Sequence, residues 1–386
     1  MNLAKLLEGP AVVTHRGVSF HSRGGAVLTP EAATFPIETD AYGPIGQRGA
    51  GNSILLNLTP VGVWTDDVLD VLYRWRAAVT GTLVTPRYDI TAISTVTDVV
   101  TLLGTDAPRP GCPIRWAAET TKPAAITLAT TYFWGASGKI YDTEAHALTD
   151  DGTGKIDFAD DGDGDQYIIE QEPLIIHTYQ NRKITFWNGA VVAMPAIGFS
   201  TQQTLLGPVT FEAFRKNDAA WADVNSLFTV EKALLVDTPP SEADIPTQEY
   251  SWGWGAAPFD VFSLRGVGAL VPQMTLSELI SDRRGVCGRK IQSVSATASG
   301  APDGFSESQL LDILQMQGGT VGRGKSRVRA DLTIAGTGVY ASLYNAAATA
   351  LPQTFSPTDP RAGELAWVGA RTPGEAAFYV GTVADA

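Results

Sequence analysis

Short apolar or β-branched runs, separated by clusters of glycine, proline and polar residues, recur along the whole chain. Runs of this length and composition are typical of strands in a mainly β protein. Near the N-terminus they cover residues 17–20, 25–28 and 53–58. The segment Pro36–Asn52 is polar and rich in glycine, so we expect a long loop that is mobile in the isolated subunit.

One amphipathic helix is predicted at Thr65–Arg76. Thr65 supplies a hydroxyl that can cap the first turn, and Asp66 and Asp67 place carboxylates at the positive end of the helix dipole. Apolar side chains at positions 68, 69, 71, 72 and 75 then share one face. The same pattern predicts a second helix at Ser306–Gln317.

The second half of the first unit predicts strands again, at residues 184–187, 191–194, 197–199 and 209–214. Asn188-Gly189 is a strong signal for a tight hairpin. The matching Asn345-Ala346 is a poorer turn, so we expect the first hairpin to be the tighter of the two.

Two blocks of the sequence occur twice, in the same order. Residues 186–215 match 342–371, and residues 40–72 align without a gap on 282–314. The second alignment has nine identities in 33 positions, where ordinary composition gives about two. We therefore interpret the chain as a tandem duplication.

The repeats divide the chain into two domains of the same fold, each a β-sandwich or barrel with one helix. The first covers residues 1–236, and the second covers 249–386. Prolines keep the linker 237–248 extended. Residues of about 84–170 are a β-rich insertion in the first domain, which we expect on a surface away from the core. One strand candidate in it is 125–134.

The net charge of −13 has the wrong sign for a protein that grips DNA phosphates. It suits a surface past which DNA slides, and equally an ordinary acidic soluble protein. The apolar runs are too short for a membrane span, and the N-terminus lacks the apolar length of a secretory signal. Cys112 and Cys287 occupy non-equivalent positions, which predicts no disulfide framework and favours a reducing cytosol.

Residues Gly319–Ser326 satisfy the phosphate-loop pattern G-x-x-x-x-G-K-[ST]. That loop requires a strand before it and a helix after it, whose free amides bind phosphate. Here the predicted helix precedes the motif and an alternating strand follows it. We therefore interpret the segment as a basic loop in which Lys325 binds no nucleotide.

The remaining residues predict no catalytic, cofactor or metal site. Asp161, Asp163 and Asp165 alternate as in a calcium loop, but the required glycine and glutamate are missing. The acidic run Asp150–Asp165 is therefore expected to be a solvated loop. The four histidines are scattered, and no nucleophile motif occurs. Large aromatic residues fall at strand positions, which favours a core role over a sugar-binding groove; examples are Trp187, Phe211 and Trp367.

Both repeats share a composite pattern in residues 174–215 and 332–371. It consists of L-x-I, an asparagine followed by small apolar residues and a proline, and a strand G-x-[VL]-x-[FW] ahead of an arginine. This pattern resembles the major tail proteins, or tail tube proteins, of long-tailed bacteriophages. The resemblance implies a β-sandwich with one helix, rings of six such units, and rings stacked into a tube that conducts DNA.

For a chain with two units, the resemblance implies homotrimeric rings with pseudo-sixfold symmetry. It also implies virion partners such as tape measure, terminator and distal tail proteins, assembly in the virion tail after synthesis in the host cytoplasm, and no membrane. The segments 36–52 and 272–290 would order against a neighbouring ring, and the insertion would lie outside the tube. DNA would pass through without specific binding.

Three alternatives stay open. A baseplate or distal tail ring protein would use the same fold, a nucleotide-binding protein would use residues 319–326, and a carbohydrate-binding protein would expose aromatic side chains on a groove.

A DNA conduit predicts an acidic lumen, which the 41 acidic against 28 basic residues can supply. Basic residues would then lie at subunit or ring contacts, some facing the acidic run of a neighbour, in individually weak pairs. These residues are Arg283, Arg284, Arg323, Lys325, Arg327 and Arg329.

Overall fold

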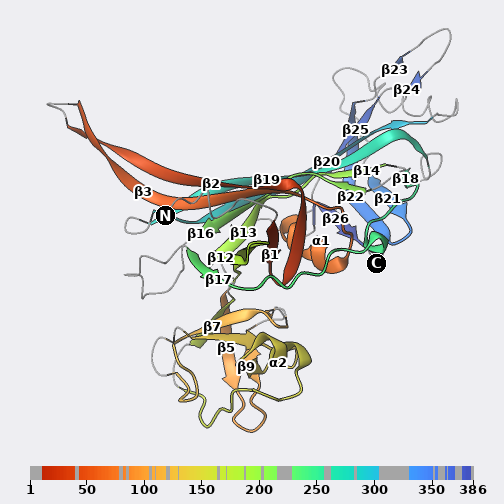
Figure 1. Cartoon of the computed structure of the whole chain (residues 1–386). Helices are drawn as coiled ribbons and strands as arrows, with labels where there is room; N and C mark the ends of the chain where they lie inside the picture. The colour runs from red at the N-terminus through yellow and green to blue at the C-terminus, as the bar shows by residue number, and fades with distance from the viewer. Residues whose placement is uncertain are drawn as a thin grey trace, which may run out of the picture.

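The computed structural model of the chain is mainly β, as the sequence predicts. It describes residues 11–39, 43–77, 81–83, 87–103, 107–108, 110–118, 122–128, 130–162, 166–170, 172–186, 188–200, 204–214, 228–255, 262–281, 285–303, 330–350, 353–354, 361–362, 364–369 and 376–383. Two units built on large sheets lie side by side, and a smaller body lies below the first of them in the view of Figure 1. This smaller body contains β5 (Arg87–Ile93), β7 (Pro113–Ala118), β9 (Ile140–Tyr141) and α2 (Glu144–Thr149).

The first unit is an eight-stranded sheet in the order β13-β16-β3-β2-β1-β11-β12-β17. Its strands are β1 (Ala11–His15), β2 (Val18–Thr39), β3 (Gly43–Pro60), β11 (Leu174–Thr178), β12 (Arg182–Phe186), β13 (Asn188–Ala193), β16 (Val209–Phe214) and β17 (Phe228–Lys232). Leu56 and Phe211 from one half of the sheet share a buried cluster with Ile176 and Phe186 from the other half. The two halves therefore face each other across one core.

The second unit belongs to a ten-stranded sheet whose main path is β15-β14-β19-β20-β25-β22-β21-β18. Its own strands are β18 (Ser251–Trp254), β19 (Leu264–Ser281), β20 (Gly285–Pro302), β21 (Ala330–Gly336), β22 (Val339–Ala350), β25 (Leu365–Val368) and β26 (Phe378–Gly381). The first unit contributes three strands to this sheet, which are β4 (Gly81–Leu83), β14 (Ile197–Phe199) and β15 (Thr204–Leu206). A separate two-stranded sheet joins β23 (Gln353–Thr354) to β24 (Arg361–Ala362).

The long hairpin β2–β3 has a close copy in β19–β20. Strand β20 begins and ends 242 residues after β3. Thr39 lies opposite Gly43 in the first hairpin, and Ser281 lies opposite Gly285 in the second. Each hairpin also has irregular register at matching places near its tip. The two units thus repeat the same pairing as well as the same sequence pattern.

The expectation of a long loop at 36–52 is wrong, and the counterpart segment 272–290 is not a loop either. These residues are mostly in strands, since β2 continues to Thr39, β3 starts at Gly43, and β19 and β20 run through to residues 281 and 285. Glycine has low intrinsic strand preference, but pairing along a hairpin satisfies the backbone groups of every residue. The backbone pairing therefore outweighs the local composition.

The predicted hairpin at Asn188-Gly189 is also wrong. Asn188 starts β13 and lies opposite Phe214 of β16, while β12 pairs with β11 and β17. In the second unit, Asn345 lies within the continuous strand β22, with a positive φ of 47°. A left-handed Asn inside a strand bends it. The two asparagines therefore mark a crossing from one half of the sheet to the other.

Helix α1 (Asp66–Leu72) and the 3-10 turn η2 (Arg74–Ala77) confirm the helix predicted at Thr65–Arg76. The Thr65 hydroxyl accepts a hydrogen bond from the Val68 amide, as its capping role requires. Val68, Leu69, Val71 and Leu72 are buried. The second predicted helix, 306–317, lies outside the described residues.

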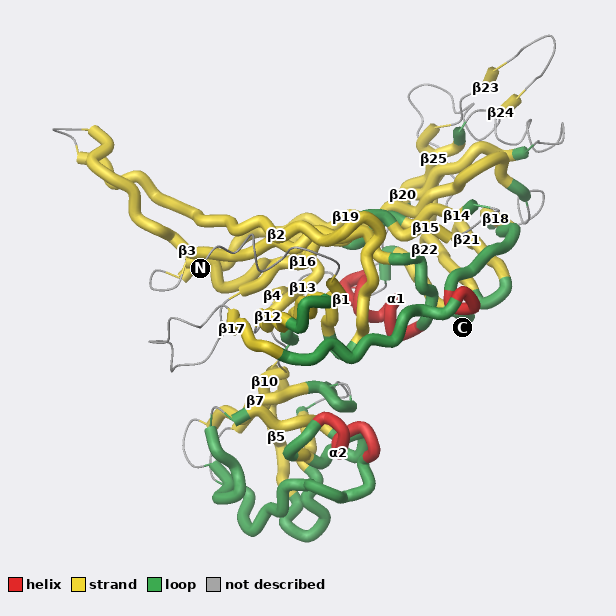
Figure 2. The backbone as a smooth tube through the Cα atoms, viewed as in Figure 1, coloured by secondary structure: helices red, strands yellow, loops and turns green. Residues whose placement is uncertain are grey.

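The insertion forms a body of its own, below the two units in Figure 2. Its strands β5 (Arg87–Ile93), β6 (Val100–Leu102), β7 (Pro113–Ala118), β8 (Thr131–Trp134), β9 (Ile140–Tyr141) and β10 (Gln166–Glu170) form one sheet, with α2 (Glu144–Thr149) beside it. A separate cluster that includes Ile114, Trp116 and Trp134 is its core. The strand predicted at 125–134 is shorter, since 124–128 contain turns and β8 begins at Thr131.

Between the units, residues 237–248 contain the 3-10 turn η3 (Glu242–Asp244) and no strand. Asp237 in this segment accepts one hydrogen bond from the Tyr179 hydroxyl and pairs with His21 at 2.8 Å. These contacts hold the start of the connection against the first unit.

Candidate assembly interface

The two units are joined by main-chain pairing. Strand β14 of the first unit lies antiparallel to β19 of the second, with Ile197 opposite Leu270 and Gly198 opposite Ala269. Strand β15 covers the other side of β14. Short strand β4, which follows η2, pairs with β20 at residues 289–291. The first unit therefore contacts both strands of the β19–β20 hairpin.

Apolar side chains seal this junction. Ile197 and Leu270 are fully buried, and Phe199 of β14 makes edge-to-face contacts with Tyr250 and Trp252 of the second unit. The ring centroids of Phe199 and Tyr250 are 5.2 Å apart. The main buried cluster consequently runs through both units without interruption. Burial on this scale makes the junction a folded core and not a surface contact.

A buried ion pair adds a charged contact to the junction. Both carboxylate oxygens of Glu212 on β16 accept from the Arg289 guanidinium on β20, at 2.7 and 2.9 Å. Glu212 is 1% exposed, and Glu278 makes a further pair with Arg289 at 2.7 Å. Hydrogen bonding to Glu212 is the first cause that raises the Arg289 pKa above its ordinary value. Two N–H donors of one guanidinium bind the two carboxylate oxygens, so the pair fixes the orientation of the side chains in addition to pairing their charges.

Helix α1 lies between the units and is bonded at its start to the end of the second one (Figure 1). The Asp66 carboxylate accepts from the Thr382 hydroxyl at 2.9 Å. The Trp64 indole donates to the carbonyl of Gly381 at 3.1 Å, and Tyr73 packs edge-on against Phe378. The helix thus fixes the second unit to the first through polar and apolar contacts together.

In the second unit, β14 pairs with the edge of β19. The matching edge of β2 in the first unit has no such covering strand among the described residues. Strand β2 pairs with β1 through residues 18–21 and with β3 along its other side. Beyond residue 21, no described strand lies on the β1 side of β2. Val27 at this edge is 62% exposed. An exposed, unpaired strand edge is a ready acceptor for another strand.

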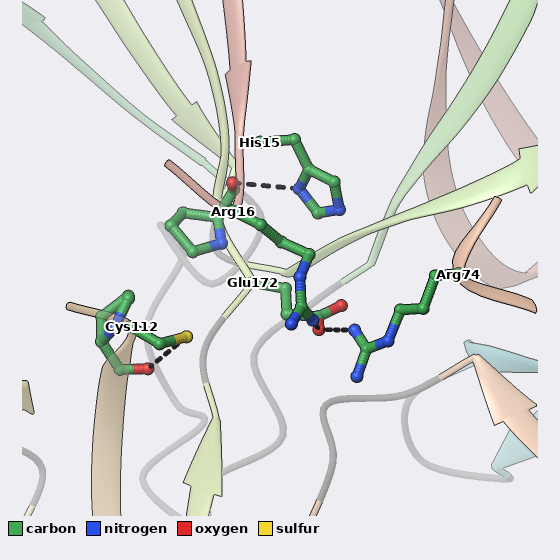
Figure 3. A network of polar contacts seen from close by, with 7 residues as sticks. His15, Arg16, Arg74, Cys112 and Glu172 are labelled. Atoms are coloured by element: carbon green, nitrogen blue, oxygen red, sulfur yellow. Dashed lines mark hydrogen bonds and ion pairs between the residues drawn. The ribbon is translucent and has the colours of Figure 1, made fainter. Parts of the chain in front are cut away.

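A second polar cluster lies where the insertion rejoins the first unit (Figure 3). Arg16, in the β1–β2 turn, and Arg74, in η2, both donate to the same oxygen of Glu172. The Glu172 carbonyl also accepts from the Gly189 amide at 2.7 Å. The pairs join three separate segments at the base of the insertion, so a structural role explains them.

His15 lies beside this cluster and is 2% exposed. Burial, followed by the nearby Arg16 charge, lowers its pKa to about 3, although its Nδ1 lies 3.3 Å from the Pro173 carbonyl. The ring also meets Phe211 edge-on at 5.5 Å. His15 is therefore neutral near pH 7 and acts as a packed core residue.

The structure brings together few of the polar residues that the sequence singles out. The phosphate-loop pattern 319–326, the six basic residues at 283–329, and Asp163 and Asp165 lie outside the described residues. Within the acidic run, Asp150 caps α2 in a left-handed conformation and accepts from Ser137 and Tyr141. No described group of three His, Cys, Asp or Glu side chains could hold a metal ion.

Aromatic side chains behave as predicted for a core. Phe211 and Trp367 are buried, and Trp367 stacks on Phe262 with ring centroids 6.0 Å apart. The other tryptophans whose side chains are described are buried or half-buried. They leave no tryptophan platform for a sugar on the described surface. Trp187 lies outside the described residues.

Comparison with known proteins gives no identification. No family model matches the chain, and no curated protein does either. None of the described helices is long and apolar enough to cross a membrane.

The sequence does not group the residues of the junction as a set. Glu212 and Arg289 are 77 positions apart, and Phe199 resembles any strand residue. The repeat did contain a signal, since Glu212 aligns with Val368 and Arg289 with Gln47. A charged pair present in one copy of a repeat and missing from the other marks a position at which the two copies differ.

Proposed function

We propose that the chain is a structural virion protein that assembles into stacked rings and forms the tail tube of a long-tailed bacteriophage. Three copies would form a ring with pseudo-sixfold symmetry, because each chain supplies two equivalent units. DNA would pass through the bore, and the tube would contact tape measure, terminator and distal tail proteins at its ends. The sequence resemblance supports the family, and the junction between the two units supports the assembly mode.

The observation that carries the proposal is the strand addition of β14 to β19. It is a contact between two copies of one fold, made head to tail and not face to face. Head-to-tail contacts leave one partner surface unused at each end, so they propagate until a ring closes or a filament grows. A duplicated unit joined in this way favours self-assembly over catalysis.

The charge balance agrees with a conduit. With 41 acidic and 28 basic residues, the chain can line a bore that repels phosphates. A basic bore would hold DNA through counterion release and slow its passage. The insertion has its own core and lies at one side of the two units, which suits a position on the outer surface.

A test is electron microscopy of the purified protein with its mass measured by light scattering. Stacked rings or tubes with threefold symmetry are expected, with a net negative lumen. Single rings that never stack would instead favour a baseplate or distal tail ring protein. A protein that stays monomeric at high concentration, or a tube with a positive lumen, would contradict the proposal.

A further inference from the structure

The two large hairpins differ at one edge. On β19, residues 268–270 pair with β14, and Leu270 is fully buried. The matching residues of β2, which are Ala26–Leu28, pair with β3 alone among the described strands. Leu28, which aligns with Leu270, is only half-buried. The edge of β2 has the same construction as that of β19 but lacks its covering strand.

The covering strand exists elsewhere in the chain as a second copy. Gln353 lies opposite Ala362 and Thr354 opposite Arg361 in the β23–β24 sheet. These positions follow the β14–β15 pairs, Ile197 with Leu206 and Gly198 with Leu205, by 156 residues. The described residues place no third strand beside β23 and β24. This pair and the tip of the β2–β3 hairpin project at opposite ends of the molecule (Figure 1).

We propose that β23 of one copy adds antiparallel to the edge of β2 in a second copy. The β14–β19 register predicts the pairs directly, with Gln353 opposite Leu28 and Thr354 opposite Val27. This inference rests on the self-assembly proposed above and specifies the residues of its contact. The occupant of the β2 edge is then a second copy of this chain.

Backbone chemistry supports the pairing. Neither β23–β24 nor the Ala26–Leu28 edge of β2 has a further strand beside it among the described residues, and joining the two would form a ladder of backbone hydrogen bonds next to the exposed Val27. The contact is heterologous, because it joins different surfaces of the two copies. Such contacts close into rings only at a fitting angle.

The contact between copies differs from the junction within the chain in one respect. Val368 and Gln47 occupy the positions of Glu212 and Arg289, so the buried ion pair is not repeated. We therefore expect assembly through β23 and β2 to depend little on salt concentration, since screening acts on charges.

Disulfide trapping between two variants tests the register. Val27→Cys and Thr354→Cys copies are purified separately, mixed and oxidised mildly. Opposed strand residues have Cα atoms close enough for a disulfide, so a covalent dimer containing one copy of each variant is expected. Neither variant alone should give it, and the parent chain controls for Cys112 and Cys287.

A register control uses Thr29→Cys mixed with Thr354→Cys. Thr29 is exposed and lies two positions beyond Val27 on the same strand face. Diagonal neighbours are too far apart for an unstrained bridge, so trapping should fall to the background of the parent chain. Equal trapping at Thr29 and Val27 would overturn the register.

A charge placed on the edge gives a second readout. Val27→Lys should abolish assembly, because a charged side chain on an exposed edge strand disfavours strand addition. Val96→Lys is the matched control, since Val96 is 89% exposed on the insertion. It should assemble like the parent, and both variants should keep the circular dichroism of the parent. Assembly of Val27→Lys at parent concentrations would overturn the inference.

The outcomes separate the two proposals. Trapping of the Val27 and Thr354 pair without any stacked rings would support the strand addition and contradict the tail tube. Rings and tubes from the parent chain without trapping, and with Val27→Lys still assembling, would contradict the strand addition alone. A parent chain that stays monomeric would contradict both.

Discussion

The hairpins β2–β3 and β19–β20 have matching register but different surroundings. Both end in the same pairing, and β3 and β20 have the same length. The second hairpin is covered by β14 on one strand and β4 on the other, and its Arg289 holds the buried Glu212. Strand β2 of the first hairpin has an uncovered edge at Val27 among the described residues.

This difference shows how a duplicated unit can divide its contacts. One copy of the interface is satisfied within the chain, where the connection 237–248 keeps the units together at high effective concentration. In the assembly proposed above, the other copy is made with a neighbouring chain and forms at ordinary protein concentration. Substitutions at equivalent positions should therefore have different consequences in the two hairpins.

The largest difference is expected for the two aligned leucines. Leu270→Ala removes a fully buried side chain on β19, opposite Ile197 of β14, so the free energy of unfolding should fall by about 3 kcal/mol. Leu28→Ala removes a half-buried side chain, so the monomer should lose about 1 kcal/mol. Urea unfolding followed by tryptophan fluorescence, at concentrations below assembly, measures both.

One outcome would contradict the contrast between the two hairpins. If Leu270→Ala and Leu28→Ala lowered the free energy of unfolding equally, the β2 edge would be covered in the monomer. Ring formation gives a further check. Leu28→Ala should weaken ring formation, while Leu270→Ala, as long as the monomer stays folded, should leave the contact at the β2 edge unchanged.

A slightly smaller loss is expected from the buried ion pair. Arg289→Ala leaves Glu212 buried without its main partner. This should lower the free energy of unfolding by at most about 3 kcal/mol, because Arg289 itself is partly exposed. The double variant Glu212→Met with Arg289→Met should recover much of that loss. Lys183→Ala, which breaks an exposed pair with Glu231, is the control at about 0–1 kcal/mol. A loss no larger than this control would show that the pair adds little to the junction.

The first unit should also contribute a pH dependence that the second lacks. His15 on β1 has its pKa lowered to about 3, while Trp254 occupies the matching position on β18, as Val13 opposite Phe20 and Trp252 opposite Phe262 indicate. Between pH 3 and 6.5 the unfolded chain binds a proton at His15 that the folded chain does not. Stability therefore rises with pH in this window, by up to about 1.4 kcal/mol per unit.

His15→Gln isolates this contribution. Carboxylates such as Asp237 also lose stabilising charge in acid, so the quantity to compare is the slope of unfolding free energy against pH in the two proteins. The variant should have the flatter slope between pH 4 and 6.5, whatever its stability at pH 7. Identical slopes would show that His15 is protonated in the fold.

The sequence predicts the mainly β fold class better than it predicts the boundaries of elements. The α1 cap at Thr65 is read correctly because capping is local chemistry. The segment 36–52 is misread because its glycines have no strand preference of their own, and the partner strand that pairs them is set by the hairpin as a whole. Asn188-Gly189 is misread because a strand crossing uses the same residues as a turn.

The junction between the two units is harder to predict from the sequence. Its parts, β4, β14, Glu212 and Arg289, come from separate segments, and only the fold places them together. The repeat nevertheless predicts that any contact made once within the chain has a counterpart. A contact between repeats is visible in the sequence only as a difference between them, such as Gln47 in place of Arg289.

The smallest effect is expected where α1 meets the end of the second unit. The Thr382 hydroxyl donates to the Asp66 carboxylate at 2.9 Å, in an exposed position. Thr382→Ala should lower the free energy of unfolding by about 0.5–1 kcal/mol, since the contact is solvated. Thr382→Ser keeps the hydroxyl and should stay within a few tenths of the parent chain. If the alanine and serine variants unfold alike, the hydroxyl does not anchor the helix, and the junction depends on its apolar contacts and on Glu212 with Arg289.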